Sequence, residues 1–88
     1  MKSDMYFVYV LRSVRDGRTY TDFTENLKKR LCDHSAGAVN ATRHRRPLVV
    51  LFTEKFDTIK DAKKRECWWK SGAGRRVLRV YYYKNTRE

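Results

Sequence analysis

The sequence has little negative charge, few cysteines and no long apolar run, and each shortage excludes a class of protein. Its 88 residues contain 10 Asp and Glu against 21 Lys and Arg, so the net charge is +11. The longest apolar run, residues 5–11, ends at Arg12 and is too short for a membrane span or a signal-peptide core. We therefore expect a cytoplasmic protein without a membrane partner.

The two cysteines, Cys32 and Cys67, are too few for the disulfide framework of a small secreted domain. A structural zinc site needs clustered ligands, and the spacing of Cys32, His34 and Cys67 does not match a zinc finger or ribbon. We expect both cysteines to be free thiols.

The excess of positive charge predicts a polyanionic partner, against the alternative that it only keeps a small domain soluble. A chain of this length forms one compact domain, residues 1–88. The basic residues are spread over the chain, which suits contacts to phosphates rather than reading of bases. We expect nucleic-acid contacts from Lys28, Lys29, Arg43, Arg45, Arg46, Lys70 and Arg75.

Three segments have the composition of strands. Residues 6–11 are β-branched or aromatic on both alternating faces, which predicts a central strand covered on each side. Asp16-Gly17 is a turn signal, so residues 18–21 are predicted to return as the second strand of a hairpin. Residues 48–52 form the third strand, after a basic loop at residues 39–46.

Two helices complete an α+β pattern. Thr24 followed by Glu25 predicts the start of one helix, and Gly37 its end. Thr58 begins the second helix, which runs to about Lys70 before a glycine-containing break at residues 71–74. Residues 77–83 fit either a short helix or a further strand.

The second helix carries a carboxylate on its apolar face. At about 100° per residue, Glu66 lies on the same stripe as Ile59, Ala62 and Trp69. An unpaired buried carboxylate is costly. Glu66 is therefore a salt-bridge partner of an arginine, a residue at the exposed edge of the stripe, or a metal ligand or catalytic carboxylate.

The first helix places Arg30 and His34 on the side that carries Leu27 and Leu31. Each alone is more often a solvated arginine or a satisfied, partly buried histidine. Together with Glu66 and the strand tyrosines Tyr9 and Tyr20, they form a polar set that core packing does not explain.

Two aromatic tripeptides, Phe7-Val8-Tyr9 and Tyr20-Thr21-Asp22, precede the first predicted helix with its Arg30 and His34. Arg65-Glu66 and the glycine-arginine segment 70–75 close the second. In this order the motifs resemble the GIY-YIG nuclease superfamily, in particular its small single-domain bacterial branch related to the N-terminal nuclease domain of the excision-repair protein UvrC. The resemblance covers nearly the whole chain.

This resemblance implies a small three-stranded antiparallel sheet flanked by helices, and hydrolysis of DNA phosphodiesters with one divalent ion, Mg²⁺ or Mn²⁺. Single-stranded or structured DNA is the substrate class that the branch suggests. By resemblance, Glu66 holds the metal, Arg30 stabilises charge on the phosphate, and Tyr9 acts as, or helps to position, the general base. Tyr20 and His34 orient water, phosphate or Tyr9. A tyrosine with a pKa of about 10 needs nearby cations for such a role.

One residue departs from the family pattern. The second tripeptide normally ends in glycine, and here Asp22 adds a side chain and a negative charge. Asp22 points to solvent, repels the scissile phosphate, or adds a carboxylate to the metal site. The second hypothesis is accordingly a catalytically inactive nucleic-acid-binding module of the same fold. A third is a basic domain that binds an acidic protein.

Overall fold

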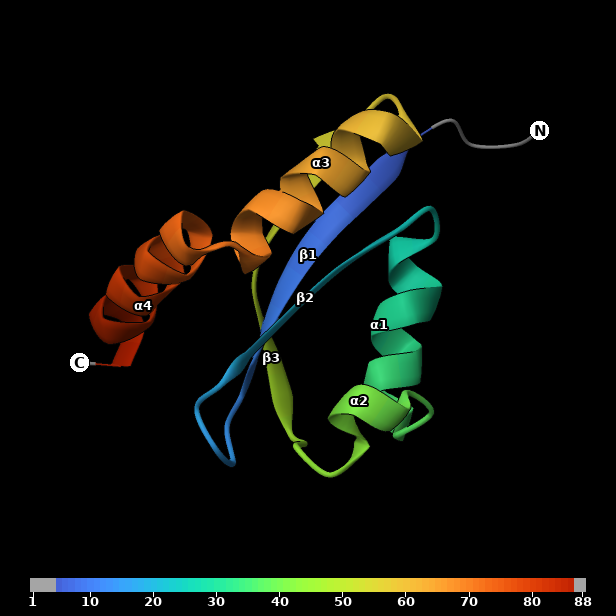
Figure 1. Ribbon diagram of the computed structural model, residues 1–88. Helices are drawn as coiled ribbons and strands as arrows, with labels where there is room; N and C mark the ends of the chain where they lie inside the picture. The colour runs from blue at the N-terminus through green and yellow to red at the C-terminus, as the bar shows by residue number, and fades with distance from the viewer. Residues whose placement is uncertain (1–4, 87–88) are drawn as a thin grey trace.

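The computed structural model describes residues 5–86, with side chains as far as residue 80 (Figure 1). Its three strands form an antiparallel sheet in the order β2-β1-β3. The predicted α+β class and the central position of the first strand are confirmed. In chain order the elements are β1 (Tyr6–Ser13), β2 (Thr19–Thr24), α1 (Leu27–Ala36), α2 (Asn40–Arg43), β3 (Leu48–Phe56), α3 (Ile59–Lys70) and α4 (Gly72–Thr86).

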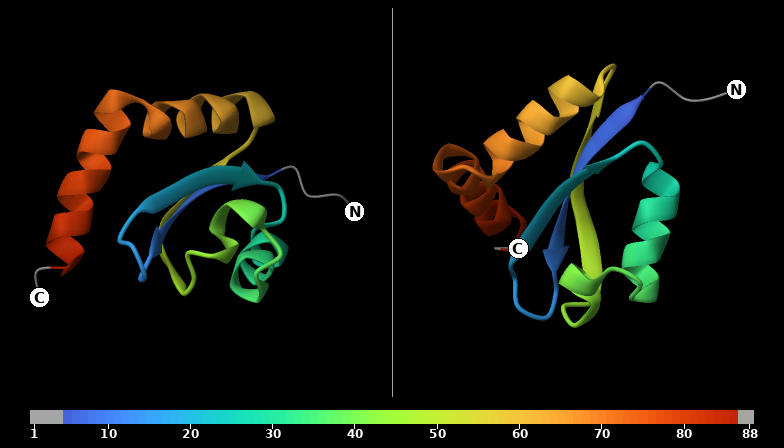
Figure 2. Two further views of the ribbon diagram at one scale, coloured as in Figure 1. Left: turned by 60° about the horizontal axis from the view of Figure 1, so that its bottom comes forward. Right: turned by 45° about the vertical axis from the view of Figure 1, so that its right-hand side comes forward.

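The helices lie on both faces of the sheet (Figure 2). Helices α1 and α2 pack on one face, α3 crosses the other, and α4 turns sharply away from α3 beside the hairpin end of the sheet. None of the helices in the described part of the chain is long and apolar enough to cross a membrane.

Alternation along β1 divides its side chains between the two faces. Val8 and Val10 belong to the main apolar core together with Ala62, Trp69 and Leu78 from the helices. Tyr9 and Leu11, which are also buried, point toward the opposite face because successive strand residues alternate. The central strand therefore supplies both the apolar core and the polar site.

A bulge in β3 increases the apolar surface on the α3 face. Val10 pairs with Phe52 but Leu11 pairs with Val50, so Leu51 is an extra residue in the ladder. Leu51 and Phe52 consequently both pack against the core, and the Phe52 ring lies 5.0 Å from that of Trp69.

The start of α1 differs from the prediction. Thr24 is still paired with Phe7 in the sheet, so the helix cannot begin there. Its hydroxyl instead accepts a hydrogen bond from the backbone N–H of Asn26, and Asn26 is the N-cap, with Oδ1 accepting from the N–H of Lys29. The predicted end is confirmed: Gly37 is the C-cap with a φ of 83°, a left-handed conformation that favours glycine.

The segment predicted as a basic loop, residues 39–46, contains the short helix α2. Val39 and Thr42 are buried, whereas Arg43 on the same turn is exposed. The prediction of a loop was based on the charged residues of this segment, whereas its uncharged residues pack beneath α1.

The start of α3 is confirmed, since Thr58 accepts a hydrogen bond from the N–H of Asp61. Ser71 ends α3 as predicted, but the glycines after it begin α4 instead of forming a loop. A Cβ on Gly74 would lie 2.2 Å from the carbonyl oxygen of Trp68, so the close approach of the two helices requires glycine. Residues 77–83, for which the sequence left two options, are helical.

Candidate active site

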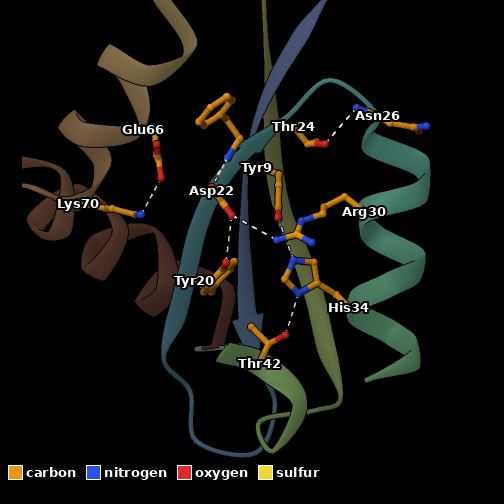
Figure 3. A network of polar contacts seen from close by, with 11 residues as sticks. Tyr9, Tyr20, Asp22, Thr24, Asn26, Arg30, His34, Thr42, Glu66 and Lys70 are labelled. Atoms are coloured by element: carbon orange, nitrogen blue, oxygen red, sulfur yellow. Dashed lines mark hydrogen bonds and ion pairs between the residues drawn. The ribbon is translucent and has the colours of Figure 1, made fainter. Parts of the chain in front are cut away.

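A buried chain of hydrogen bonds links β1, α1 and α2. The Tyr9 hydroxyl lies 2.9 Å from Nε2 of His34, and Nδ1 of the same ring lies 2.8 Å from Oγ1 of Thr42 (Figure 3). All three side chains are buried, with Tyr9 and Thr42 at 0% exposure. Both ring nitrogens of His34 are therefore occupied, and the chain fixes the Tyr9 hydroxyl in place.

A second polar group lies beside the first, toward the surface. The Tyr20 hydroxyl donates to Oδ2 of Asp22 at 3.1 Å, and the same oxygen lies 3.6 Å from an Arg30 nitrogen. Oδ1 of Asp22 accepts from the N–H of Phe23 at 2.8 Å. Asp22 thus points into the cluster rather than to solvent, and it lies against Tyr20 and Arg30 (Figure 3).

Strand register explains why these residues meet. Tyr9 pairs with Asp22 and Leu11 pairs with Tyr20 across β1 and β2, so their side chains share one face. Arg30 and His34 are four residues apart on α1 and project toward that face. The Tyr20 and His34 rings lie 5.2 Å apart, centroid to centroid.

The cluster alters the protonation of its members. Burial and the nearby Arg30 lower the pKa of His34, so its imidazole is neutral near pH 7. Burial raises the pKa of Tyr9, and burial together with Asp22 raises that of Tyr20. The hydrogen bond to Tyr9 raises the pKa of Arg30, whose guanidinium remains charged.

Exposure separates the two tyrosines. Tyr9 is fully buried, whereas Tyr20 is half-buried and lines a cavity of about 620 Å³. Of the two roles expected for Tyr9, the structure favours positioning over direct contact with a water, because its hydroxyl is enclosed and its phenolate is disfavoured. Tyr20 is the tyrosine that a bound substrate can reach.

Glu66 lies on α3, on the other side of β2 from Arg30 and His34 (Figure 3). Its side chain is 15% exposed, and Oε2 pairs with Nζ of Lys70 at 2.7 Å. Of the interpretations left open, the salt bridge is observed, with a lysine in place of an arginine. No group of three or more His, Cys, Asp or Glu side chains gathers within residues 5–86.

The donor set around Glu66 is nevertheless compatible with Mg²⁺ or Mn²⁺. Among the described residues, Oε1 of Glu66 has no hydrogen-bond partner, so one carboxylate oxygen is open. Mg²⁺ in proteins is commonly held by one or two carboxylates, with waters and substrate phosphates completing its shell. Asp22 instead contacts Tyr20, Arg30 and the N–H of Phe23, so Glu66 is the carboxylate of this site with an oxygen that has no partner among the described residues.

The residues predicted to contact nucleic acid fall into two groups. Lys28, Arg43 and Arg75 have no side-chain partner in the part of the chain that the structure describes. The other four are engaged: Lys29 pairs with Asp33, Arg45 with Asp16 and Lys70 with Glu66, and Arg46 donates to the carbonyls of Arg43 and Ser35.

The sequence analysis did not predict the polar contacts of three residues. Thr42 completes the hydrogen bonds of His34, and the uncharged run at residues 38–42 within a basic segment was the available signal. Glu54 and Arg65 form a separate pair on the α3 face. Alternation in β3 places Glu54 on the same face as Phe52, which was the available signal for this pair.

Comparison with known proteins assigns the same set of elements to one family. The model of the GIY-YIG catalytic domain matches residues 5–78 of the chain. This range contains both tripeptides and the residues of the cluster, together with Glu66 and Lys70.

Individual relatives extend over most of the chain. A UPF0213 protein of Staphylococcus saprophyticus is 31% identical over 78 residues, which cover 88% of this chain and 94% of the relative. A UPF0213 protein of Halobacterium salinarum is 38% identical over 63 residues, covering 70% and 80%. The solution NMR structure of a UPF0213 protein from Bacillus halodurans is similar with a TM-score of 0.53 and 28% identity, covering 86% of this chain and 83% of its own.

Proposed function

The chain belongs to the GIY-YIG family, and from this premise we propose that it is a metal-dependent DNA endonuclease acting in the cytoplasm on single-stranded or branched DNA. The observation that carries the proposal is the meeting of Tyr9, Tyr20, Arg30 and His34 on one face of the sheet. Hydrolysis of a phosphodiester depends mainly on positioning and on stabilisation of charge, which such a set supplies.

Arg30 is the residue that binds the scissile phosphate. Its side chain is 35% exposed and always charged, and its contact to the Asp22 carboxylate is long, at 3.6 Å. A phosphate oxygen can replace that carboxylate and gain a shorter, charge-assisted hydrogen bond. Negative charge that develops on the phosphate during attack is stabilised there.

Tyr20 orients the attacking water. Its hydroxyl already donates to Asp22, so its oxygen is free to accept a hydrogen bond from a water beside the phosphate at Arg30. Tyr9 and His34 lie behind Tyr20 and hold its ring through close aromatic contacts. Because Thr42 and Tyr9 occupy both nitrogens of His34, the imidazole keeps one orientation.

Glu66 is the metal ligand in this proposal. A bound Mg²⁺ or Mn²⁺ supplies neutralising positive charge and Lewis acidity at the phosphate. Lys70, whose Nζ lies 2.7 Å from Oε2 of Glu66, holds the carboxylate in position until the ion binds.

The proposal is tested by cleavage of labelled single-stranded, duplex and branched DNA with Mg²⁺ or Mn²⁺, beside EDTA. Glu66→Gln is expected to reduce cleavage at least about 10²-fold, since it keeps the shape but loses the charge that holds the ion. Glu25→Gln, which changes an exposed glutamate outside the cluster, is the matched control and should cut normally. Undiminished cutting by Glu66→Gln would remove this residue from its role.

The Asp22–Arg30 contact favours a second candidate function, a nucleic-acid-binding module without catalysis. A carboxylate at Arg30 opposes the entry of a scissile phosphate. Salt-sensitive DNA binding without cleavage, together with cleavage gained in Asp22→Gly, would favour this alternative.

A further inference from the structure

A basic cavity adjoins Tyr20 on the side away from Arg30. The cavity, of about 620 Å³, lies between the hairpin end of β2 and the junction of α3 with α4, and Figure 2 shows α4 beside that end of the sheet. Four cationic side chains line it, together with Tyr20 and the buried Trp69: Arg18, Lys70, Arg75 and Arg79.

The charge of this cavity is largely uncompensated. Lys70 is paired with Glu66, but Arg18, Arg75 and Arg79 have no carboxylate partner among the described residues. Like charges around a shared hollow repel one another, so the arrangement favours an anion between them. Guanidinium groups bind phosphate oxygens with paired hydrogen bonds, which suits a phosphodiester.

A second basic cavity, near the end of α2, is a weaker candidate. Two of its arginines already donate to backbone carbonyls, Arg15 to His44 and Arg46 to Arg43 and Ser35. Those contacts close the ends of the short helices and occupy the donors. The arginines of the first cavity have no such partners in the described part of the chain.

We propose that the cavity formed by Arg18, Lys70, Arg75 and Arg79 is a phosphate subsite, separate from Arg30, for a nucleotide that flanks the cleaved bond. This inference rests on the proposed function in that Tyr20 forms the boundary between the two sites. A strand whose scissile phosphate lies at Arg30 passes over Tyr20 and places a neighbouring phosphate among these four cations. The subsite thereby fixes the register of the strand.

The test uses the full chain in EDTA and measures binding to short single-stranded DNA, with the integrity of the DNA checked on denaturing gels. In a series of strands, one phosphate at a time is replaced by an uncharged methylphosphonate. With the unsubstituted protein, two replacements are expected to weaken binding most: that of the phosphate in the subsite and that of the phosphate at Arg30.

The variant Arg75→Ala/Arg79→Ala removes two exposed cations from the cavity. One methylphosphonate position should then lose its effect while the others keep theirs, because the variant no longer binds the phosphate at that position. The slope of log K against log salt should become shallower by about 0.7 for each phosphate that the variant no longer binds.

Arg76→Ala/Lys60→Ala removes the same charge from exposed positions outside the cavity and is the matched control. It should leave the position-dependent pattern unchanged. The proposal is overturned if the control weakens binding as much as the cavity variant, or if the cavity variant keeps the native pattern. Because binding is read without cleavage, a failure of the nuclease proposal in the Glu66→Gln assay remains distinct from a failure of the subsite.

Discussion

Two of the arginine–carboxylate pairs in this domain, Glu54–Arg65 and Asp22–Arg30, lie on opposite faces of its sheet and differ in geometry. On the α3 face, Arg65 donates to both oxygens of Glu54 at 3.0–3.3 Å, and Trp69 Nε1 donates to the same carboxylate at 2.8 Å. The Arg65 guanidinium also lies 4.8 Å and 4.7 Å from the ring centroids of Trp68 and Trp69. On the α1 face, Asp22 and Arg30 share one contact of 3.6 Å.

This difference indicates different uses of the same chemical pair. The Glu54–Arg65 pair has its hydrogen bonds satisfied within the protein and connects α3 to β3, so it contributes to stability. The Asp22–Arg30 pair is long, half-exposed and readily exchanged for a phosphate, so its arginine remains available to a substrate. The comparison thus distinguishes the α3 face of the sheet, where the ion pair stabilises the fold, from the α1 face, where the arginine is available to a substrate; we call the α1 face the chemical face.

The largest expected effect is on cleavage after substitution of the α1-face arginine. Arg30→Ala should lower kcat/KM about 10²- to 10³-fold, because the charge that stabilises the phosphate is lost. Arg30→Lys should recover only part of the activity, since an ammonium lacks the planar fork. Initial rates of DNA cleavage measure the activity of both Arg30 variants. Arg65→Ala is the control and should cleave DNA normally at temperatures where it is folded. Equal losses for the two arginines would abolish the distinction between the faces.

The reverse ranking is expected for stability. Arg65→Ala should lower the free energy of unfolding by about 2 kcal/mol, because it breaks a bidentate pair and leaves the Glu54 carboxylate half-buried. Arg30→Ala should lower it by less than about 1 kcal/mol, as for a half-exposed ion pair. Urea denaturation of the two variants measures the difference, and a larger loss for Arg30→Ala would contradict the comparison.

His34, on the chemical face, should also make the free energy of unfolding depend on pH. The pKa of His34 is lowered in the folded state, so the unfolded chain binds a proton first as the pH falls. Its contribution to stability is full above about pH 6.5 and is lost as the pH falls toward the lower folded pKa. The pKa of Glu54 is also lowered, so its contribution is lost only at more acidic pH, below the usual range of a glutamate.

Urea denaturation at several pH values between 7 and 5 measures this loss. His34→Gln, which can still bond to Tyr9 and Thr42, should reduce it, whereas His44→Gln at an exposed position should not. An unchanged pH profile in His34→Gln would show that burial of the imidazole does not control stability in this range.

The smallest expected effect concerns Asp22. Asp22→Asn removes the charge that competes for Arg30 and should tighten binding of single-stranded DNA about three- to fivefold, in line with a half-exposed ion pair. Asp33→Asn removes the same charge from α1, at a residue that pairs with Lys29, and controls for net charge. Fluorescence anisotropy compares the two, and equal gains would show that Asp22 acts only through overall charge.

The local patterns of the sequence determined most of the secondary structure. The central first strand, the hairpin, the end of α1 at Gly37 and the start of α3 at Thr58 follow from alternation, turn residues and capping chemistry. The ordered motifs also predicted the family and the α+β class. These features depend on residues close together in the chain, so they are visible without coordinates.

Tertiary structure decided what depends on contacts between distant segments. Thr24 is paired in the sheet, so α1 begins later than local capping residues indicated. Residues 40–43 form a helix because they pack against the rest of the domain. Only the fold placed Thr42 on His34, turned Asp22 toward Arg30, and joined Arg18 to Arg75 and Arg79 around one cavity. The physical reason is that a side chain's pKa, exposure and partners are set by neighbours in space, which local sequence patterns do not encode.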